Sequence, residues 1–440
     1  MIYLLSLFSG IGAFEKALKR LKIPFELINY CEIDKYASKA YSLIHGEPES
    51  KNARDVTQID CQNIPFGVDF LTYGFPCQDI SSAGLQKGFS DENGNRTRSG
   101  LFFNALDVIE KTRPKIAIAE NVKALTSKRF SDEFKTVLDG LTAAGYTNYY
   151  KVLNAKDYGI PQNRDRVFIV SIRNDINRGF QFPAPFPLDC CLRDFLEPVV
   201  DECFFLSDSK LNFILNNGLK NKIQNGRIDS DSLRIPEPTA AGYKTAAVGD
   251  CVNVGFPNSK TRRGRVTSGM SAALITFNQL GVVVYDDYNS RVRGDQTTVG
   301  TITTNVGNDA PRNGQKLIVC NDETKFPVAY DEQNGYLRKD GCVGTITTGG
   351  SSPKHNNRVV TSDLRIRKFT PKECFRLMDF DDADFEILAQ NGISNAQLYK
   401  LAGNSIVVRV LECLFLEIFK QYGDVFKSGQ QIGFYDMLGE

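Results

Sequence analysis

The sequence lacks the residues from which metal sites and disulfide frameworks are usually built. Its 440 residues include no tryptophan and only two histidines, His45 and His355, and none of the eleven cysteines forms a C-x-x-C pair. Structural zinc sites draw their ligands from cysteine and histidine at short spacings, and a disulfide framework uses an even number of cysteines. We therefore predict no metal site, and cysteines that stay reduced inside the cell.

Charge of one sign and long hydrophobic runs are missing as well. Lys plus Arg (53) and Asp plus Glu (52) nearly cancel and leave a formal charge of +1, which argues against a histone-like polycation. A positive surface would have to be gathered on one face. The apolar opening, Met1–Phe8, has no basic flank and is typical of a buried strand, not of a signal peptide. Because no apolar run reaches membrane-spanning length, we expect a cytoplasmic protein with no membrane partner.

The first 180 residues alternate between short β-branched segments and helical periods. Strands are predicted at Ile2–Leu7, Phe25–Cys31, Val68–Tyr73, Lys115–Ala119 and Val167–Ile172, and helices at Gly12–Leu21, Lys35–Ile44, Leu101–Lys111 and Asp132–Ala144. This order predicts an α/β fold with a doubly wound, mostly parallel, Rossmann-like sheet covered on both faces. Such sheets bind ligands beyond the carboxyl ends of their strands, so the strand-to-helix turns are the places to search for a site.

The first two of these turns favour a nucleoside-type cofactor. Phe8-Ser9-Gly10-Ile11-Gly12 joins a strand to a helix, and its glycines would let the backbone approach a ligand closely. The second strand leads into Glu32, whose carboxylate could accept from both hydroxyls of a ribose, and Asp55 is a further acidic candidate. Each residue alone could be solvated surface, and the glycine spacing is not the G-x-G-x-x-G of dinucleotide enzymes.

The third turn carries a possible nucleophile. Gly74-Phe75-Pro76-Cys77-Gln78 follows a predicted strand, and Glu120 follows the next one, so both side chains can reach the same crevice. A buried structural cysteine is the usual alternative, although a thiolate is intrinsically very nucleophilic. Arg164 and Arg166 stand before another strand and could hold an oxyanion or a carbonyl.

Taken in order, five segments resemble the DNA (cytosine-5) methyltransferases, with a layout closest to the bacterial and phage enzymes. They are Phe8–Gly12, Pro76-Cys77-Gln78, Glu120-Asn121-Val122, Gln162–Arg166 and Gly403-Asn404-Ser405. The resemblance covers roughly residues 1–184 and 364–421. It implies transfer of a methyl group from S-adenosyl-L-methionine to C5 of a cytosine that has been flipped out of double-stranded DNA at a specific sequence.

The resemblance also assigns roles to residues. Cys77 would attack C6 of cytosine, Glu120 in its protonated form would donate to N3, and Arg166 would hold O2, with Arg164 in the same catalytic motif. A carboxyl group can donate near neutral pH only if burial raises its pKa. The implied cofactor contacts are Phe8, Gly10, Ile11, Gly12, Glu32, Ile33, Asp55, Pro76, Leu101, Asn404 and Ser405. Gln78 and Ser81 would contact the DNA, and Ser81–Arg98 would close over it.

The middle of the chain is predicted to be a β-rich target-recognition domain inserted into the catalytic domain. The expected boundaries are 1–184 for the first catalytic part, 185–363 for the recognition domain and 364–440 for the returning part. The basic residues Lys260, Arg262, Arg263 and Arg265 are candidates for phosphate contact, with solvated surface as the alternative. Val299–Thr304 recurs exactly as Val343–Thr348, and Ser271–Thr276 is a degenerate relative. These repeats indicate either a repeated β-unit or several recognition elements on one chain.

After residue 364 the pattern becomes helical again. Thr370-Pro371-Lys372-Glu373 is a capping box that opens a helix at Cys374–Asp379. A second, amphipathic helix follows Gly403-Asn404-Ser405, and its apolar face is predicted to pack on the N-terminal sheet.

Two other functions compete with the methylation of DNA. A tRNA cytosine-5 methyltransferase would use the same catalytic residues, although the insert of roughly 180 residues argues against it. An inactive DNA-binding relative would not need Cys77, Glu120 and Arg166 together. We expect double-stranded DNA as the partner, a possible cognate restriction endonuclease acting on the same site, and a monomer, since one flipped base needs only one subunit.

Overall fold

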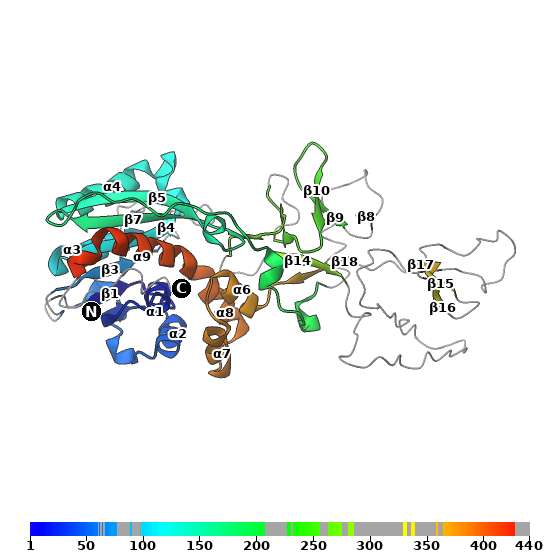
Figure 1. Cartoon of the computed structure of the whole chain (residues 1–440), viewed down its shortest axis with the longest axis horizontal. Helices are drawn as coiled ribbons and strands as arrows, with labels where there is room; N and C mark the ends of the chain where they lie inside the picture. Colours follow the sequence, from blue (N-terminus) through cyan, green and yellow to red (C-terminus); the bar gives the residue numbers. More distant parts are fainter. Residues whose placement is uncertain are drawn as a thin grey trace. The chain divides into compact units, whose positions relative to one another are not determined.

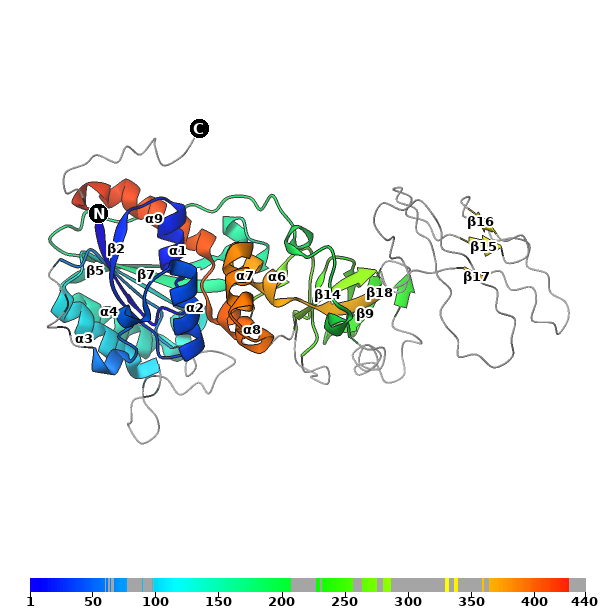
Figure 2. The same ribbon diagram turned by 90° about the horizontal axis from the view of Figure 1, so that it is seen from below.

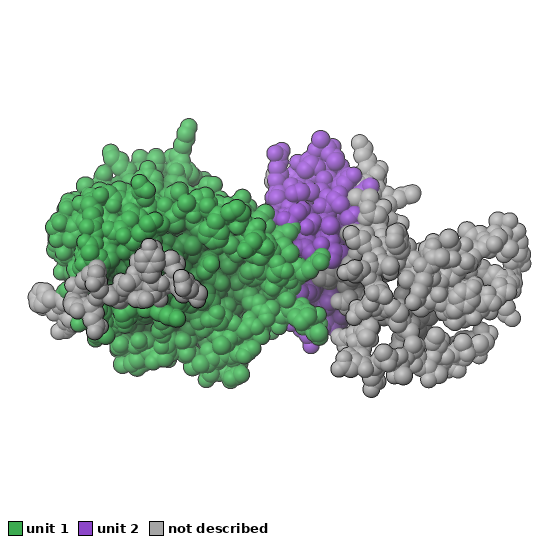
Figure 3. Space-filling view, in the orientation of Figure 1, with its two compact units in different colours: residues 1–200, 269–280, 369–440 green, residues 201–268, 281–368 purple. Residues whose placement is uncertain are grey.

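The computed structural model describes most of the chain and divides it into two compact units. It describes residues 1–59, 61, 64, 67–76, 89, 97, 99–206, 227–229, 232–255, 263–274, 280–285, 329–331, 336–338, 358–359 and 364–426. One unit comprises Met1–Val200, Gly269–Leu280 and Phe369–Glu440, and the other Asp201–Ser268 and Gly281–Lys368 (Figure 3). The first unit is therefore discontinuous in sequence. The segment Gly269–Leu280, inside the range predicted for target recognition, belongs to this first unit.

The first unit is built on a six-stranded sheet (Figure 1). Its strands are β1 (Ile2–Leu7), β2 (Phe25–Cys31), β3 (Phe70–Tyr73), β4 (Ile116–Val122), β5 (Tyr146–Asn154) and β7 (Asp165–Arg173), in the order β2-β1-β3-β4-β7-β5. The strands β2, β1, β3 and β4 pair in parallel, whereas β7 is antiparallel to both of its neighbours. The predicted mostly parallel sheet is confirmed, with β7 as the reversed strand.

Sequence reasoning did not predict β5. This strand lies at the edge of the sheet and is largely half-exposed, with Tyr150 52% exposed. Polar residues therefore interrupt its sequence, and it lacks the continuous apolar run that is typical of interior strands.

Helices cover both faces of this sheet (Figure 2). These helices are α1 (Ala13–Arg20), α2 (Lys35–His45), α3 (Phe102–Thr112) and α4 (Ser131–Ala143) of the N-terminal part, with α9 (Val408–Tyr422) of the returning part. The other helices of the returning part, α6 (Pro371–Leu377), α7 (Asp382–Gln390) and α8 (Asn395–Asn404), pack on one another and on α2. Successive residues of β3 face the two layers of helices. Phe70 contacts Phe415 of α9 at 5.9 Å between ring centroids, and Leu71 belongs to the core that includes Phe102 of α3.

The returning part of the chain adds helices to the first unit. The capping box of α6 is present: Glu373 N donates to Thr370 Oγ1 at 3.1 Å and Thr370 N donates to Glu373 Oε2 at 2.9 Å. The helix ends at Leu377, two residues earlier than predicted, and Asp379 beyond it has a φ of 61°. The apolar face of α9 packs on the sheet through Phe415, which also contacts Phe14 of α1 at 6.3 Å between ring centroids.

Apart from the short helical turn Glu202–Phe204, the regular structure described in the second unit is β-sheet, as the composition predicts. One sheet has the order β10-β9-β8, from β8 (Arg227–Asp229), β9 (Ser232–Pro236) and β10 (Tyr243–Ala247). Another has the order β12-β11-β14-β18, from β11 (Cys251–Asn253), β12 (Val266–Thr267), β14 (Leu280–Tyr285) and β18 (Leu364–Lys368). A third contains β15 (Ala329–Asp331), β16 (Tyr336–Arg338) and β17 (Arg358–Val359). A small apolar core joins Leu233, Val252, Val283 and Ile366.

In the first unit, part of the middle segment pairs with the arginine motif. Strand β13 (Ser271–Ala272) runs parallel to β6 (Gln162–Asn163), and Ser271 N donates to Pro161 O at 2.7 Å. The degenerate repeat copy therefore contributes residues to the first unit. Among the helices that the structure describes, none combines the length and the hydropathy needed to cross a membrane.

Candidate active site

The glycine turn after β1 has the backbone that its sequence predicts. Gly10 and Gly12 have φ angles of +57° and +78°, in the left-handed region that favours glycine. A Cβ atom on Gly12 would lie 2.2 Å from Nε2 of His45, so this position has no room for a larger residue. No described atom lies within 4 Å of a Cβ built on Gly10, so the turn borders open space there. Phe8, which is not a glycine, also has a positive φ of 53°.

Glu32 joins the end of β2 to this turn. Its Oε2 atom accepts from the Gly10 amide at 2.9 Å, and Oε1 accepts from the Asp34 amide at 2.7 Å. Burial raises the pKa of this carboxyl group. Ile33 beside it is 74% exposed, which is unusual for a large apolar side chain and leaves it available to pack on a ring. The predicted glycine and carboxylate positions thus lie together, and they fit the polar and apolar parts of an adenosine.

Glu120 and Arg166 form an ion pair at the carboxyl end of β4. Arg166 Nε lies 2.9 Å from Glu120 Oε1, and the two side chains are 19% and 13% exposed. Burial raises the pKa of Glu120, although the charges of Arg166 and Arg164 oppose this shift. The antiparallel pairing of β4 with β7 brings these residues of distant sequence together, since Val122 is opposite Arg166. Burial thus shifts the pKa of this carboxyl group in the direction that the predicted proton donation requires.

The turn that leads to Cys77 passes directly beside Glu120. A Cβ built on Gly74 would lie 3.6 Å from Glu120 Oε2. The buried Asn121 side chain donates from Nδ2 to the Phe75 carbonyl at 3.0 Å and so fixes the turn to β4. Pro76 is the last described residue before the predicted nucleophile, and Cys77, Gln78 and Ser81 lie outside the described residues.

The side chains of Arg164 and Arg166 have different partners, although both residues belong to the same motif. The Arg164 side chain is 3% exposed. Nη1 donates to the Leu274 carbonyl at 2.8 Å, and Nη2 donates to the carbonyls of Gly403 and Ser405 at 3.0 and 2.7 Å. Arg164 therefore connects the arginine motif to the Gly403-Asn404-Ser405 segment and to the degenerate repeat copy. This geometry suits a residue that positions backbone more than one that touches a substrate.

Comparison with known proteins decides the family. A family model described as C-5 cytosine-specific DNA methylase matches residues 2–420. The chain belongs to this family. The resemblance predicted from the five segments is confirmed, and the protein is a DNA cytosine-5 methyltransferase, for which S-adenosylmethionine is the implied methyl donor.

Relatives of this methyltransferase include phage and bacterial proteins. It is 32% identical over 460 residues to the orphan methyltransferase M.SPRI of Bacillus phage SPR, and the alignment covers 95% of this chain and 97% of the relative. It is 30% identical over 475 residues to the putative type II methyltransferase M.BsuMIIP of Bacillus subtilis, with coverages of 95% and 97%. The type II methyltransferase M.HhaI of Haemophilus parahaemolyticus is 39% identical over 195 residues, covering 44% of this chain and 56% of the relative.

Solved structures confirm the methyltransferase fold. A variant of DNMT2 from Spodoptera frugiperda matches with a TM-score of 0.53 and 18% identity, covering 95% of this chain and 100% of that chain. The Entamoeba histolytica methyltransferase EhMeth matches with a TM-score of 0.52 and 16% identity, covering 96% and 98%.

The other residues predicted for the site lie in different surroundings. Leu101 ends a short helical turn, Ser99–Leu101, and packs against the core of the first unit, whereas Asn404 is exposed. Arg263 in the second unit is exposed, but Arg265 is only 2% exposed, and its buried side chain is not available to a phosphate at the surface. Lys260 and Arg262 lie outside the described residues.

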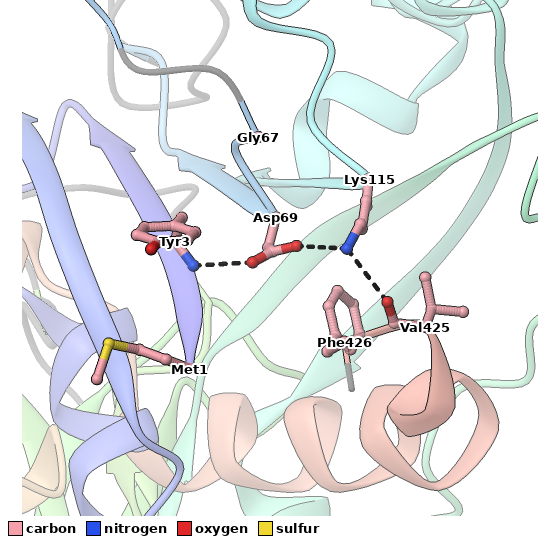
Figure 4. Close-up of a pocket in the computed structure, with 7 residues that line it drawn as sticks. All are labelled: Met1, Tyr3, Gly67, Asp69, Lys115, Val425 and Phe426. Atoms are coloured by element: carbon pink, nitrogen blue, oxygen red, sulfur yellow. Dashed lines mark hydrogen bonds and ion pairs between the residues drawn. The ribbon is translucent and has the colours of Figure 1, made fainter. Parts of the chain in front are cut away.

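A separate hollow lies at the amino ends of the strands and is not part of this site (Figure 4). Lys115 Nζ lies 2.7 Å from Asp69 Oδ1 and donates to the Val425 carbonyl at 3.1 Å. The other oxygen of Asp69 accepts from the Tyr3 amide at 2.9 Å. These groups satisfy one another, and they attach the segment after α9 to the sheet.

Proposed function

We propose that this methyltransferase modifies a cytosine flipped out of double-stranded DNA at a specific sequence, through a covalent bond between Cys77 and C6. The observation that carries the proposal is the buried Glu120, whose pKa is raised, paired with Arg166 and in contact range of the turn that leads to Cys77. A cysteine, a protonated carboxyl group and a fixed cation are the groups that activation of cytosine requires.

The chemistry gives each group a step. Cytosine C5 is too electron-poor to accept a methyl group until a nucleophile adds at C6, and Cys77 in its thiolate form adds there. Negative charge then builds on N3 and O2, where Glu120 donates a proton and Arg166 donates hydrogen bonds. S-adenosylmethionine supplies an electrophilic methyl group to C5. A water molecule takes the C5 proton, the electrons of the C5–H bond restore the C5–C6 double bond as the Cys77 thiolate leaves, and the N3 proton returns to Glu120, which gives 5-methylcytosine.

Glu120 and Arg166 keep hydrogen-bonding capacity beyond their ion pair. The pair uses Nε of Arg166 and Oε1 of Glu120. The other carboxyl oxygen of Glu120 would serve N3, and a further N–H group of the Arg166 guanidinium would serve O2.

The cofactor side of the proposal uses the glycine turn and the acids near it. Glu32 would accept from the ribose hydroxyls, Ile33 would pack on the adenine, and Asp55 would meet the adenine amine. The left-handed Gly10, the open space beside it and the exposed Ile33 support this assignment. Phe8, Ile11, Gly12, Pro76, Leu101, Asn404 and Ser405 complete the proposed contacts.

The DNA side of the proposal assigns sequence recognition to the second unit. Exposed Arg263, with Lys260 and Arg262 beside it in sequence, would contact phosphates, and Gln78 and Ser81 would contact the DNA near the flipped base. The recurrence of Val299–Thr304 as Val343–Thr348 keeps open a reader of more than one target, and both copies lie outside the described residues. The relatives named as orphan or type II enzymes leave open a cognate restriction endonuclease.

A covalent trap tests the proposal directly. Duplex DNA that carries 5-fluorocytosine at its target should become bound to the protein in the presence of S-adenosylmethionine, because fluorine at C5 cannot leave as a proton does. The target is first found by bisulfite sequencing of DNA from cells that express the chain. The trapped adduct should survive denaturing electrophoresis and should map by mass spectrometry to the peptide containing Cys77.

Two controls make this result decisive. Cys77→Ser should form no adduct and transfer no methyl group, while its affinity for the cofactor stays within about twofold. Methylation of tRNA but not of duplex DNA by the wild-type protein would overturn the choice of substrate, and an adduct retained by the variant would remove Cys77 from its role.

A further inference from the structure

We propose that Asn52 is a positioning residue for S-adenosylmethionine, because it holds the two acidic segments at Glu32 and Asp55 in one fixed arrangement. The inference rests on the proposed cofactor site, and it assigns a role to a residue that the motifs of the family resemblance do not include. Its support is a set of hydrogen bonds, a strained backbone position and a connection to the glycine turn.

The Asn52 side chain uses its full hydrogen-bonding capacity on this task. Its Oδ1 atom accepts from the amides of Glu32 at 3.0 Å and Arg54 at 2.8 Å. Its Nδ2 atom donates to the Glu32 carbonyl at 2.9 Å and to Ser38 Oγ at 2.8 Å. The residue is 9% exposed. A primary amide with two acceptor lone pairs and two N–H donors makes at most four such bonds, and all four are present.

One of these bonds supports a backbone conformation that would otherwise be unfavourable. Arg54 has a φ of 61°, in the left-handed region that non-glycine residues rarely adopt. Asn52 Oδ1 accepts from its amide, and Cys31 Sγ donates to its carbonyl at 3.0 Å. The next residue is Asp55, whose backbone direction follows from this turn. Asn52 therefore sets where Asp55 lies relative to Glu32.

The bond to Ser38 extends this arrangement to the glycine turn through one face of α2. Ser38, Tyr41 and His45 are the buried residues at positions i, i+3 and i+7 of this helix. Tyr41 stacks on Tyr30 of β2 with ring centroids 3.9 Å apart. His45 Nε2 lies 3.0 Å from the Ile11 carbonyl in the glycine turn.

The chemistry of His45 fixes the direction of that last bond. Burial lowers the pKa of His45 to about 3, so the ring is neutral at physiological pH. A carbonyl oxygen can only accept, so Nε2 carries the ring hydrogen and donates to Ile11. The same helix face thus braces the glycine turn at one end and, through Ser38, the amide of Asn52 at the other.

The amide is the side chain that this position requires. Aspartate has the same shape but cannot donate to the Glu32 carbonyl or to Ser38, and it would add a negative charge beside a buried carboxylate. Alanine removes all four bonds and leaves the left-handed Arg54 without its side-chain acceptor. Both substitutions should disturb the cofactor acids while leaving Glu120 and Arg166 in place.

The first experiment measures cofactor affinity apart from activity. Isothermal titration of the full-length protein with S-adenosylhomocysteine should give a dissociation constant at least tenfold higher for Asn52→Ala and Asn52→Asp. Asn148→Ala is the matched control, because Asn148 Nδ2 also donates to a carbonyl, that of Leu138 at 3.2 Å, but on the edge strand β5. The control should stay within twofold of the wild type.

Steady-state kinetics then separate positioning from general damage to the fold. The Asn52 variants should raise the KM for S-adenosylmethionine at least tenfold, while kcat at saturating cofactor stays within about threefold. If kcat and the melting temperature fell together with no change in KM, Asn52 would be only structural and the inference would be wrong. Asn52→Asp keeps the side-chain volume, so its KM, kcat and melting temperature distinguish the two roles even if Asn52→Ala does not fold.

A rescue experiment tests the role of the strained turn. Glycine adopts a positive φ without support, so adding Arg54→Gly to Asn52→Ala should recover at least a third of the lost affinity on a logarithmic scale. No recovery would overturn the part of the inference that concerns Asp55. If the wild type itself binds no S-adenosylhomocysteine, the proposed function fails. If it binds and the Asn52 variants bind equally well, only this inference fails.

Discussion

Arg164 and Arg166 are two residues apart, yet their surroundings give them separate tasks. Arg166 pairs with Glu120, whereas Arg164 donates to the carbonyls of Leu274, Gly403 and Ser405. A planar guanidinium can serve several acceptors at once, and lysine cannot reproduce that geometry. The identity of the residue type therefore says less about its role than the atoms that it contacts.

A lysine substitution should reduce mainly the stability at Arg164 and mainly the turnover at Arg166. Arg164→Lys should lower the free energy of unfolding by about 1–3 kcal/mol, because buried carbonyls lose their donors. Arg166→Lys keeps a positive charge beside Glu120 and should lower it by less than Arg164→Lys does, yet lower kcat by roughly 100-fold or more, since it removes a preorganised donor to the substrate. Urea denaturation and single-turnover methylation measure the two effects. Equal losses of stability in both variants would contradict the assignment.

His45 should make the protein sensitive to acid. Burial lowers its pKa from 6.5 to about 3, so the folded state holds the neutral ring that the unfolded chain protonates. Its stabilising contribution is complete above pH 6.5 and is lost as the pH falls from there toward 3. By linkage, the loss is roughly 2–3 kcal/mol at about pH 4.5.

The measurement compares the wild type with His45→Gln, which can still donate to the Ile11 carbonyl. Denaturant unfolding at pH 7 and pH 4.5 should show a smaller decrease for the variant, because glutamine does not titrate. Carboxylates contribute equally to both proteins, so the difference isolates His45. Identical decreases would show that the ring is protonated in the folded state.

At the scale of elements, the most important contact is the one between α9 and the sheet. Phe415 packs on Phe70 of β3 and Phe14 of α1, and it is 1% exposed. These residues come from the two ends of the sequence. The helix therefore links the returning part of the chain to the strands that carry the cofactor turn.

Phe415→Ala should lower the free energy of unfolding by about 3–5 kcal/mol, because it removes a buried ring and leaves a cavity. Lys420→Ala on the same helix is the control, since that side chain is 61% exposed and should change stability by less than about 0.5 kcal/mol. Thermal unfolding of both variants checks the prediction. Equal stability of the two variants would mean that α9 is not part of the core.

The strands also show which structural features can be predicted from sequence patterns. Residues Ile2–Leu7 and Phe25–Cys31 were predicted as strands with the bounds that the structure has, although β1 lies in the sheet interior and β2 at its edge. The reversed direction of β7 and the strand pairing of Ser271–Ala272 were not predicted, because pairing depends on residues distant in sequence.

At the scale of the whole molecule, nearly balanced charge has a consequence for DNA binding. With a formal charge of +1, the chain has no general excess of cations, so phosphate binding must come from a local cluster. Of the predicted cluster the structure describes Arg263, which is exposed, and Arg265, which is buried.

Salt dependence measures this contribution. Replacing Lys260, Arg262 and Arg263 together by glutamine should weaken duplex binding and reduce the slope of log K against log salt by roughly 2–3, about 0.9 for each lost phosphate contact. Arg265→Gln is the control and should leave the slope unchanged while lowering the melting temperature. Fluorescence anisotropy between about 50 and 200 mM salt distinguishes them. An unchanged slope in the triple variant would remove these residues from the DNA interface.

The order and types of the motif residues along the chain were enough to show the family of this methyltransferase and to predict its chemistry, because these residues stand in short segments. Most strands of the large sheet and the amphipathic helices were predictable as well, because their periodicity is a local property. The partner of each polar group depends on the tertiary fold. Asn52 lies in a loop and belongs to no recognisable sequence motif. Its proposed positioning role depends on hydrogen bonds to four atoms on three segments. Arg164 and Arg265 likewise differ from their neighbours through burial, and burial depends on which distant segments fold against a residue.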